Sequence, residues 1–354
     1  PSAQAVFDEY NAAGGYNGRP IELQTFDDKA DPAASTTAAR DALASGAIAL
    51  VGSSSMLDCA INNKTWVDEG IVSLTATGVD PFCFATPNIA ATNTGPYFGM
   101  FSTLWHGSET LGYDKICAFN VPDDAAGRAA YKQAQDTWAK ETGKELALYD
   151  DSLVRGQSSY AGNIAQISTE KCDSIFINEI GPAVTAFLSE ATNQGISLPV
   201  LALTPVYSQE FVDTLSYGGD VHITAEFSPW SDLEDPSNTE WKEVMERNGI
   251  GLTSFAQGGY LSAKAFIHIL ENEMDAEAEV TREAFTAAAK GMTEPMDTNG
   301  MTGTPWIFGS GETHQPNAAA WPLVIKADSG EWTSVGPWII GDDNGWVNTT
   351  VPTS

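Results

Sequence analysis

Two short apolar runs near the start of the chain each end in small hydroxyl residues. Ala47–Leu50 leads into the turn Val51–Ser55, and Ile71–Leu74 leads into Thr75–Thr77. Runs this short and apolar are typical of buried parallel strands, so each turn should open the next helix. The first N–H groups of a helix have no partner within it, and with Ser and Thr hydroxyls they can bind a carboxylate. The two turns therefore predict an anion site at the ends of neighbouring strands.

Other interpretations of the same turns are available. Ser and Thr are good helix N-caps, and a single turn of this kind would favour that structural role, whereas two on adjacent strands favour binding. A serine hydrolase would need a GxSxG elbow, but Gly52–Met56 has no second glycine. The four histidines lie in no recognisable partner motif and are interpreted as surface or locally satisfied: His106, His222, His268 and His314. Phosphate-loop and dinucleotide fingerprints are absent from the sequence, so no cofactor is expected.

The composition limits the class of protein. A chain of 354 residues is too long for most single cores, so two lobes are expected. Lys and Arg number 17 against 47 Asp and Glu, and the net charge of -30 would repel nucleic acids and anionic membranes. The acidity is interpreted as solubility in a salty or exposed setting, because the carboxylates are scattered. No apolar run approaches the roughly 20 residues that span a bilayer.

The cysteines favour disulfides over metal binding. They are four in number, with no CxxC pair and no histidine at metal-ligand spacing, so zinc is not expected. Cys59 and Cys83 follow the first and second hydroxyl turns, and a bridge between them would clamp the turns together. Cys117 and Cys172 lie in or before apolar strands and are either a second bridge or two buried thiols. Asp297–Gly300 and Asp342–Gly345 resemble fragments of calcium loops but lack further ligands, and both are interpreted as turns.

The order of predicted elements alternates strand and helix twice. In the first third, a strand over Ile21–Phe26 and a helix opened by Asp31-Pro32 precede the two hydroxyl turns. Five strands and their helices follow between Ile116 and Glu226, and two late helices have one apolar face. The tail, including Thr304–Phe308 and Trp321–Ile325, is interpreted as rich in strands. This order predicts two parallel α/β lobes of similar size.

Several short motifs follow one another along the chain. They are Asn11–Gly15 with Gly18, Asp27–Asp28 before Pro32, the serines after Val51–Gly52, Asp68–Val72, Asp80–Pro81, Phe187–Leu188, Gly195–Ile196, Pro199–Val200 and Phe255–Tyr260. In order and approximate spacing, the series resembles the type I periplasmic binding proteins, in particular the branched-chain amino acid (leucine/isoleucine/valine) branch of the substrate-binding proteins of ABC transporters. The resemblance covers nearly the whole chain. It implies an α/β fold of two Rossmann-like lobes with parallel sheets, joined by three crossover segments: lobe 1 from 1–85 and 229–305, lobe 2 from 86–228 and 306–354.

The resemblance also assigns candidate ligand-binding residues. In lobe 1, the segments that would hold a carboxylate contribute Ser54, Ser55, Met56, Thr75, Ala76 and Thr77. In lobe 2, Ala126 and Gly181 stand where amino-acid binders of the family carry tyrosines, and the acidic residue for an α-amino group falls near Pro205. Glu179 and Tyr207 are candidate substitutes. These departures favour a ligand larger or flatter than leucine, such as an aromatic acid.

The function implied by the resemblance is capture without chemistry. The chain would be a bacterial, exported substrate-binding protein of an ABC importer, periplasmic or lipid-anchored outside the cell. As a monomer, it would enclose a small carboxylate-bearing ligand by lobe closure and deliver it to the permease. A sensory or receptor module of the same fold is the alternative. The family begins with a strand that this sequence lacks, so either the chain continues upstream or another segment fills that position.

Overall fold

The computed structural model describes residues 1–232, 234–309, 315–327 and 329–341, which form two compact units. Unit 1 contains 1–95 and the described residues of 234–318, and unit 2 contains 96–232 and those of 319–341. These boundaries differ from the predicted lobes, because 86–95 and the described part of 306–318 belong to unit 1 and 229–232 belongs to unit 2. The reason is packing: a strand at Ile89–Ala91 pairs inside unit 1, and the indole nitrogen of Trp306 donates to the carbonyl of Ala91 (3.3 Å).

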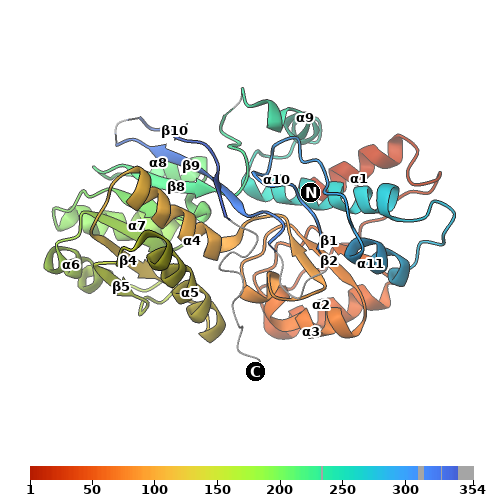
Figure 1. Ribbon diagram of the computed structural model, residues 1–354, viewed down its shortest axis with the longest axis horizontal. Coiled ribbons are helices and arrows are strands. Elements are labelled where there is room, and N and C mark those ends of the chain that lie inside the picture. Colours follow the sequence, from red (N-terminus) through yellow and green to blue (C-terminus); the bar gives the residue numbers. More distant parts are fainter. Residues whose placement is uncertain (233, 310–314, 328, 342–354) are drawn as a thin grey trace. The chain divides into compact units, whose positions relative to one another are not determined.

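Unit 1 is built on three short parallel strands in the order β1-β2-β3, with helices on both faces (Figure 1). Its elements are α1 Ser2–Ala12, α2 Pro32–Ala44, β1 Ala49–Val51, α3 Asp58–Asp68, β2 Val72–Thr75, the 3-10 turn η1 Pro81–Cys83, β3 Ile89–Ala91, η4 Pro236–Asn238, α9 Thr239–Arg247, α10 Ser254–His268, the π turn η5 Ile269–Glu273 and α11 Arg282–Lys290. Helices α2 and α3 lie on one face, and α1, α10 and α11 lie on the other. The two strands predicted from the hydroxyl turns, β1 and β2, are confirmed as neighbours.

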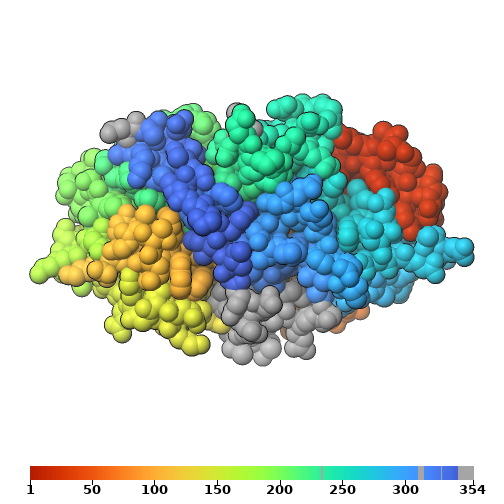
Figure 2. Space-filling view, turned by 45° about the horizontal axis from the view of Figure 1, so that its top comes forward, coloured from red at the N-terminus to blue at the C-terminus, as the bar shows by residue number. Residues whose placement is uncertain are grey.

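Two helices of unit 1 begin at side-chain caps. Asp31 caps α2 by accepting from the N–H of Ala34 (2.8 Å), with Pro32 in the first position. Thr253 caps α10 in the same way through the N–H of Ala256 (3.1 Å). Phe7 of α1 packs edge-on against Phe266 of α10, with ring centroids 5.5 Å apart. Figure 2 shows the red N-terminal residues against the cyan surface of the later helical segment.

One predicted strand of unit 1 does not pair. Ile21–Phe26 belongs to no β-ladder, and Leu23–Phe26 makes no backbone hydrogen bond within the described ranges. Its start is fixed by Asn11, whose side-chain oxygen and nitrogen bond the N–H (2.7 Å) and carbonyl (2.8 Å) of Ile21. The prediction of a paired strand was therefore wrong, because the position beside this segment is an open groove and not a neighbouring strand.

Unit 2 has a larger, mixed sheet in the order β10-β9-β8-β7-β6-β4-β5, with β11 also paired to β9. Its elements are α4 Gly95–Trp105, the π turn η2 His106–Thr110, β4 Ile116–Asn120, α5 Ala125–Thr142, β5 Leu148–Asp150, α6 Ala161–Glu170, β6 Ser174–Asn178, α7 Gly181–Asn193, β7 Val200–Ala202, η3 Thr204–Val206, α8 Gln209–Thr214, β8 Val221–Ala225, β9 Ala319–Ile325, β10 Trp332–Ser334 and β11 Ile339–Ile340. The five strands from β4 to β8 are parallel, as predicted.

The tail departs from the parallel pattern. β9 runs antiparallel to β8, and β10 and β11 are antiparallel to β9. Trp321–Ile325 therefore forms a strand as predicted, whereas Thr304–Phe308 forms only the isolated bridge of Trp306 to Met296. In the described part of the chain, no helix combines the length and the apolarity needed to cross a membrane.

Two disulfides are present. Cys59 pairs with Cys83 (Cα–Cα 5.1 Å), as the positions of the two turns suggested. Cys117 pairs with Cys172 (Cα–Cα 5.8 Å), which decides between the two alternatives for that pair. Asn299 and Gly300 have positive φ angles, and Asp297 accepts from the N–H of Asn299 (2.8 Å), so this segment is a turn as interpreted. Asp342–Gly345 lies outside the described residues.

Two of the four histidines are buried in unit 2, so the interpretation of these as surface or satisfied residues was wrong. His106 begins η2 and His222 lies in β8, with side chains 2% and 3% exposed and ring centroids 5.7 Å apart. Nε2 of His106 and Nδ1 of His222 have no partner in the described structure. Burial lowers the pKa of each imidazole to about 4, and the neighbouring His106 lowers that of His222 further. His314 lies outside the described residues.

The histidine pair predicts acid sensitivity. Unfolded histidines bind protons below about pH 6.5, whereas the folded pair stays neutral down to about pH 4. The free energy of unfolding is therefore highest above pH 6.5. It falls as the pH drops toward 4, by about 3 kcal/mol for each histidine. Denaturant unfolding between pH 7.5 and 4.5 measures it: H106Q/H222Q should show a smaller loss than the parent chain. His268→Gln is the control, because that side chain is 20% exposed. Equal slopes in all three chains would contradict the prediction.

Candidate functional site

The two hydroxyl turns of unit 1 are joined to each other. The N–H groups of Ala76 (2.9 Å) and Thr77 (3.1 Å) both donate to the carbonyl of Ser53. The turn after β1 is therefore held against the turn after β2 at the carboxyl edge of the sheet. These two amides are occupied within the protein, so they are not donors for a ligand.

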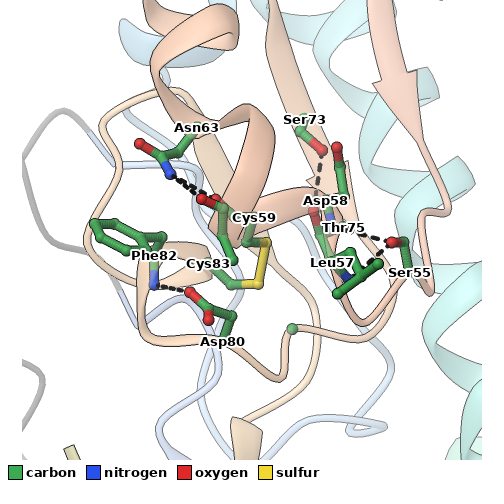
Figure 3. The surroundings of a disulfide bond; sticks show 12 residues. Ser55, Leu57, Asp58, Cys59, Asn63, Ser73, Thr75, Asp80, Phe82 and Cys83 are labelled. Atoms are coloured by element: carbon green, nitrogen blue, oxygen red, sulfur yellow. Dashed lines mark hydrogen bonds between the residues drawn. A yellow bond between two sulfur atoms is a disulfide. The ribbon is translucent and has the colours of Figure 1, made fainter. Parts of the chain in front are cut away.

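Ser55 has a structural role in this turn. Its Oγ accepts from the N–H groups of Leu57 and Asp58 (3.0 Å each) and donates to the Asp28 carboxylate. Figure 3 shows Ser55 and Leu57 just ahead of α3. Ser55 therefore holds the approach to α3 from two residues before the N-cap position, which is Leu57 and has no side-chain capping bond, so Ser55 is not the N-cap that the structural interpretation expects.

Two carboxylates lie beside the start of α3. Asp28 bonds to Ser55, and Asp58 occupies the first turn of the helix. Burial raises the pKa of Asp58, the negative charge of Asp28 adds to the rise, and hydrogen bonds from Asn62 oppose it. The positive electrostatic potential at the start of this helix is therefore partly cancelled on the side of Asp28. A ligand anion would have to bind on the other side of the turn.

The remaining predicted residues of unit 1 differ in accessibility. Thr75 is 1% exposed and its hydroxyl bonds that of Ser73 (3.0 Å), while Ala76 is fully buried. Ser54 is exposed, Met56 is 51% exposed and Thr77 is half-buried. Among the described residues, the hydroxyls of Ser54 and Thr77 have no hydrogen-bond partner, nor do the N–H groups of Ser54–Met56. These are the groups of the turns that remain available to a ligand.

The Cys59–Cys83 disulfide connects the segments that follow the two hydroxyl turns. Cys59 lies in the first turn of α3 and Cys83 in η1, which follows the second hydroxyl turn (Figure 3). Asp80 caps η1 by accepting from the N–H of Phe82 (2.9 Å). Because the bridge ties the helix after one turn to the segment after the other, it restricts their relative movement.

Helix α10 brings a further side chain to this edge. A Cβ on Gly258 would stand 2.5 Å from the carbonyl oxygen of Ala76, so only glycine permits this approach. Thr92 donates to the carbonyls of both Ala76 (3.1 Å) and Gly258 (3.3 Å). Phe255, in the first turn of α10, is 60% exposed. It is a candidate contact that the sequence reasoning did not assign, although an aromatic residue directly after the Thr253 cap was a possible signal.

In unit 2, the predicted residues follow the carboxyl ends of strands. Ala126 lies in the first turn of α5, where Asp124 accepts from the N–H of Gly127 (2.7 Å). Gly181 begins α7, and a Cβ there would meet nothing closer than 3.8 Å. Tyr207 does not reach the surface: it is 5% exposed, stacks on Trp230 (4.6 Å) and bonds Ser231 through its hydroxyl (2.7 Å). Tyr207 is thus a packing residue in this structure.

Glu179 is buried in an ion-pair network. Its Oε2 accepts from Arg155 (3.0 Å), which also binds Asp123 (2.9 Å). Burial raises the pKa of Glu179, and the Arg155 charge opposes that rise. Arg155 was not among the predicted residues, and its only sequence signal is that it is a lone cation in the loop after β5. Arg155 is shared between Glu179 and Asp123, so one cation faces two carboxylates and Glu179 is only partly neutralised within the unit.

Two buried asparagines were also missed. Asn120 ends β4 and Asn178 ends β6, and they lie opposite each other in the ladder. They are 0% and 7% exposed, and within the described ranges both amide atoms of Asn120 and Nδ2 of Asn178 lack partners. No group of three or more His, Cys, Asp or Glu side chains among the described residues is placed to hold a metal ion.

Comparisons with known proteins identify the family. The family model described as periplasmic binding protein matches residues 2–331, whereas no curated protein sequence matches. Among solved structures, a putative branched-chain amino acid ABC transporter from Rhodospirillum rubrum is 22% identical, with 94% of this chain and 93% of that chain covered and a TM-score of 0.67. An ABC transporter substrate-binding protein from Aeropyrum pernix is 14% identical, with 100% and 94% covered and a TM-score of 0.83.

A third structure carries a different ligand in its name. The fatty acid ABC transporter substrate-binding protein from Thermomonospora curvata is 18% identical, with 99% of this chain and 89% of that chain covered and a TM-score of 0.75. The family and these structures are binding proteins and not enzymes, so the expected fold and the expected capture without chemistry are confirmed. The chain belongs to the periplasmic binding protein family.

Proposed function

We propose that this chain is the substrate-binding protein of an ABC importer and that unit 1 binds the carboxylate of a small ligand at the carboxyl edge of its sheet. The observation that carries the proposal is the pair of available hydroxyls on two hydrogen-bonded turns, Ser54 and Thr77, with the N–H groups of Ser54–Met56 beside them. Hydrogen bonds to a charged acceptor are stronger than neutral ones, so a few such donors are sufficient to orient the ligand.

The charges around the turn favour a ligand that also carries a cation. Ser54 is directly adjacent to Ser55, whose hydroxyl bonds the Asp28 carboxylate. A simple monoanion bound here is repelled by Asp28, whereas the ammonium group of an amino acid offsets that repulsion. We therefore rank amino acids above aromatic or other organic acids as ligands. That Ala126 and Gly181 of unit 2 leave room for a ligand larger than leucine, as the family resemblance implies, stays a prediction.

The remaining parts of the proposal concern the cellular setting. We propose that the protein is exported, periplasmic or lipid-anchored at the cell surface, and that it delivers its ligand as a monomer to a permease. Lobe closure on the ligand, which the family resemblance implies, stays a prediction.

The experiment begins with identification of the ligand. A thermal-shift screen compares amino acids with the matching acids that lack the amino group, such as phenylalanine with 3-phenylpropionate, because a ligand that binds only the folded chain raises Tm. Calorimetry with the best compound then compares the parent chain with S54A/T77A. We expect Kd to rise about 10-fold or more, from two lost bonds to a charged group of about 1 kcal/mol or more each.

Matched variants separate binding from stability. T36A/T37A removes two hydroxyls of α2 that bond backbone carbonyls (3.1 and 2.9 Å), and it should leave Kd unchanged. Ser55→Ala should lower stability by about 1 kcal/mol through loss of the hydrogen bonds from the N–H groups of Leu57 and Asp58. An unchanged Kd in S54A/T77A would refute the assignment of the carboxylate site.

A further inference from the structure

Three asparagines of unit 1 are followed directly by glycine. They are Asn17-Gly18, Asn248-Gly249 and Asn299-Gly300, and all three asparagines are exposed. Asparagine is a thermolabile residue, because the backbone nitrogen of the next residue can attack its side-chain amide. Glycine favours this attack because it has no side chain to hinder the approach. By sequence the three pairs are equivalent, and a fourth pair, Asn344-Gly345, lies outside the described residues.

The first and the last of these pairs occupy the middle of two-residue turns. Segment 16–19 is closed by two backbone hydrogen bonds between its end residues (2.9 and 3.0 Å), and segment 298–301 by one (3.0 Å). Both asparagines have a φ angle of 52°, and the glycines after them have φ angles of 76° and 82°. Two successive positive φ angles are the mark of a type I′ turn, for which Asn-Gly is the preferred sequence.

A turn of this kind leaves the nitrogen of its glycine unused. The hydrogen bond that closes the turn comes from the residue after the glycine, so the glycine N–H takes no part in it. Within the described ranges, the N–H groups of Gly18 and Gly300 have no partner. The side-chain amides are weakly held as well. Asn17 donates one long bond to the carbonyl of Ala276 (3.3 Å), and the side chain of Asn299 makes no bond to any described residue.

The third pair, Asn248-Gly249, has the opposite arrangement. It follows the last turn of α9, where Asn248 is the C-cap residue. The N–H of Gly249 donates to the carbonyl of Glu246 (3.1 Å). The side-chain amide of Asn248 donates to the carbonyl of Val244 (2.9 Å) and to the carboxylate of Glu9 (3.3 Å). Both the attacking nitrogen and the leaving amide are therefore held by hydrogen bonds.

We propose that Asn17 and Asn299 are sites of spontaneous deamidation and that the end of α9 protects Asn248. The glycine nitrogen forms a bond to Cγ of the asparagine, and the bond from Cγ to Nδ2 breaks. Ammonia leaves with the proton of the glycine N–H, and a five-membered succinimide remains. Water then opens the ring at either carbonyl carbon, which gives aspartate or isoaspartate. Water is the one co-reactant.

The modification changes both charge and main-chain length in unit 1. Each event replaces a neutral amide by a carboxylate, in a chain whose net charge is already -30. Isoaspartate also adds one carbon to the main chain, and a two-residue turn has no slack for it. At position 17, the bond to the carbonyl of Ala276 is lost with the amide, so the turn over 16–19 is released from that loop.

The test incubates the folded chain in mildly alkaline buffer and follows the peptides that contain the three pairs by mass spectrometry. Exchange of NH2 for OH raises the mass of each converted peptide. Asn17 and Asn299 should convert at least about 10-fold faster than Asn248. Isoaspartate should accompany aspartate at both positions, because the succinimide opens at either carbonyl. Equal rates at the three positions would overturn the proposal, and so would aspartate alone, since direct hydrolysis of the side chain gives no isoaspartate.

The unfolded chain is the control for local sequence. In concentrated guanidinium chloride the turns and the end of α9 are lost, so the three asparagines should convert at similar rates. If Asn248 is still slower there, its sequence neighbours and not its hydrogen bonds protect it, and the proposal fails. N17Q/N299Q is the matched variant, because glutamine would have to close a six-membered ring, which is slower. Its peptides at 17 and 299 should keep their mass; a mass gain that persists in them would place the reaction at another residue and refute the assignment.

Discussion

Raising the NaCl concentration from about 0.05 M to about 1 M should raise the melting temperature of this protein by roughly 10 °C. Its 47 acidic and 17 basic residues leave a net charge of -30, and the folded chain holds these charges closer together than the unfolded chain does. At 1 M salt, the Debye length shrinks to about 3 Å, so the repulsion is largely screened. Calorimetric scans across a salt series measure the effect.

A charge-neutral variant separates screening from other effects of salt. Glu145, Glu170 and Glu210 are exposed and have no ion-pair partner among the described residues. E145Q/E170Q/E210Q should have a higher melting temperature than the parent at low salt, and that temperature should depend less on salt concentration. The charge-preserving Asp substitutions at the same positions should show the same dependence of melting temperature on salt as the parent. Identical slopes for the Gln and Asp variants would show that self-repulsion does not limit stability.

Most elements of the fold could be predicted because their signals are local. Asp31-Pro32 starts a helix through a cap and a fixed φ, and the apolar runs that became β1 and β2 are too short for helices. Ile21–Phe26 has the composition of a strand, but pairing depends on a neighbour that the segment cannot specify. Trp306 was assigned to the wrong unit for a similar reason, since its indole bonds Ala91 across more than 200 positions of sequence.

The candidate site was predicted in place but not in detail. The position of the hydroxyl turns followed from strand order, whereas the use of each hydroxyl depends on tertiary contacts. Ser55 is committed to Asp28 and to the helix start, and Thr75 to Ser73, so the available donors are on Ser54 and Thr77. Glu179 was chosen for its charge, but only the structure shows that Arg155 pairs with it and with Asp123. The sequence therefore predicted that the site lies at the carboxyl edge of the unit 1 sheet. Contacts from distant segments determine which of its groups are available to a ligand.

Removing the Cys59–Cys83 disulfide should both destabilise unit 1 and weaken ligand binding. The bridge closes a loop of 24 residues, and its loss should cost about 3–4 kcal/mol by loop entropy. C59A/C83A is the suitable change because both side chains are at most 2% exposed. Binding should weaken severalfold, since the bridge ties the helix that follows the Ser54 turn to the segment that follows the Thr77 turn, and freed turns must be ordered by the ligand.

The second disulfide supplies the matched control for that claim. Cys117 is near the amino end of β4 and Cys172 precedes β6, so C117A/C172A removes a bridge at the edge of the unit 2 sheet opposite to Glu179 and Gly181. Its loop of 55 residues predicts a stability loss of about 4 kcal/mol, similar to the first. If Kd rises only for C59A/C83A, measured well below either melting transition, the first bridge organises the ligand site. If both variants lose the same affinity, reduced stability alone explains the loss, and the Cys59–Cys83 bridge is a structural staple with no role in holding the hydroxyl turns.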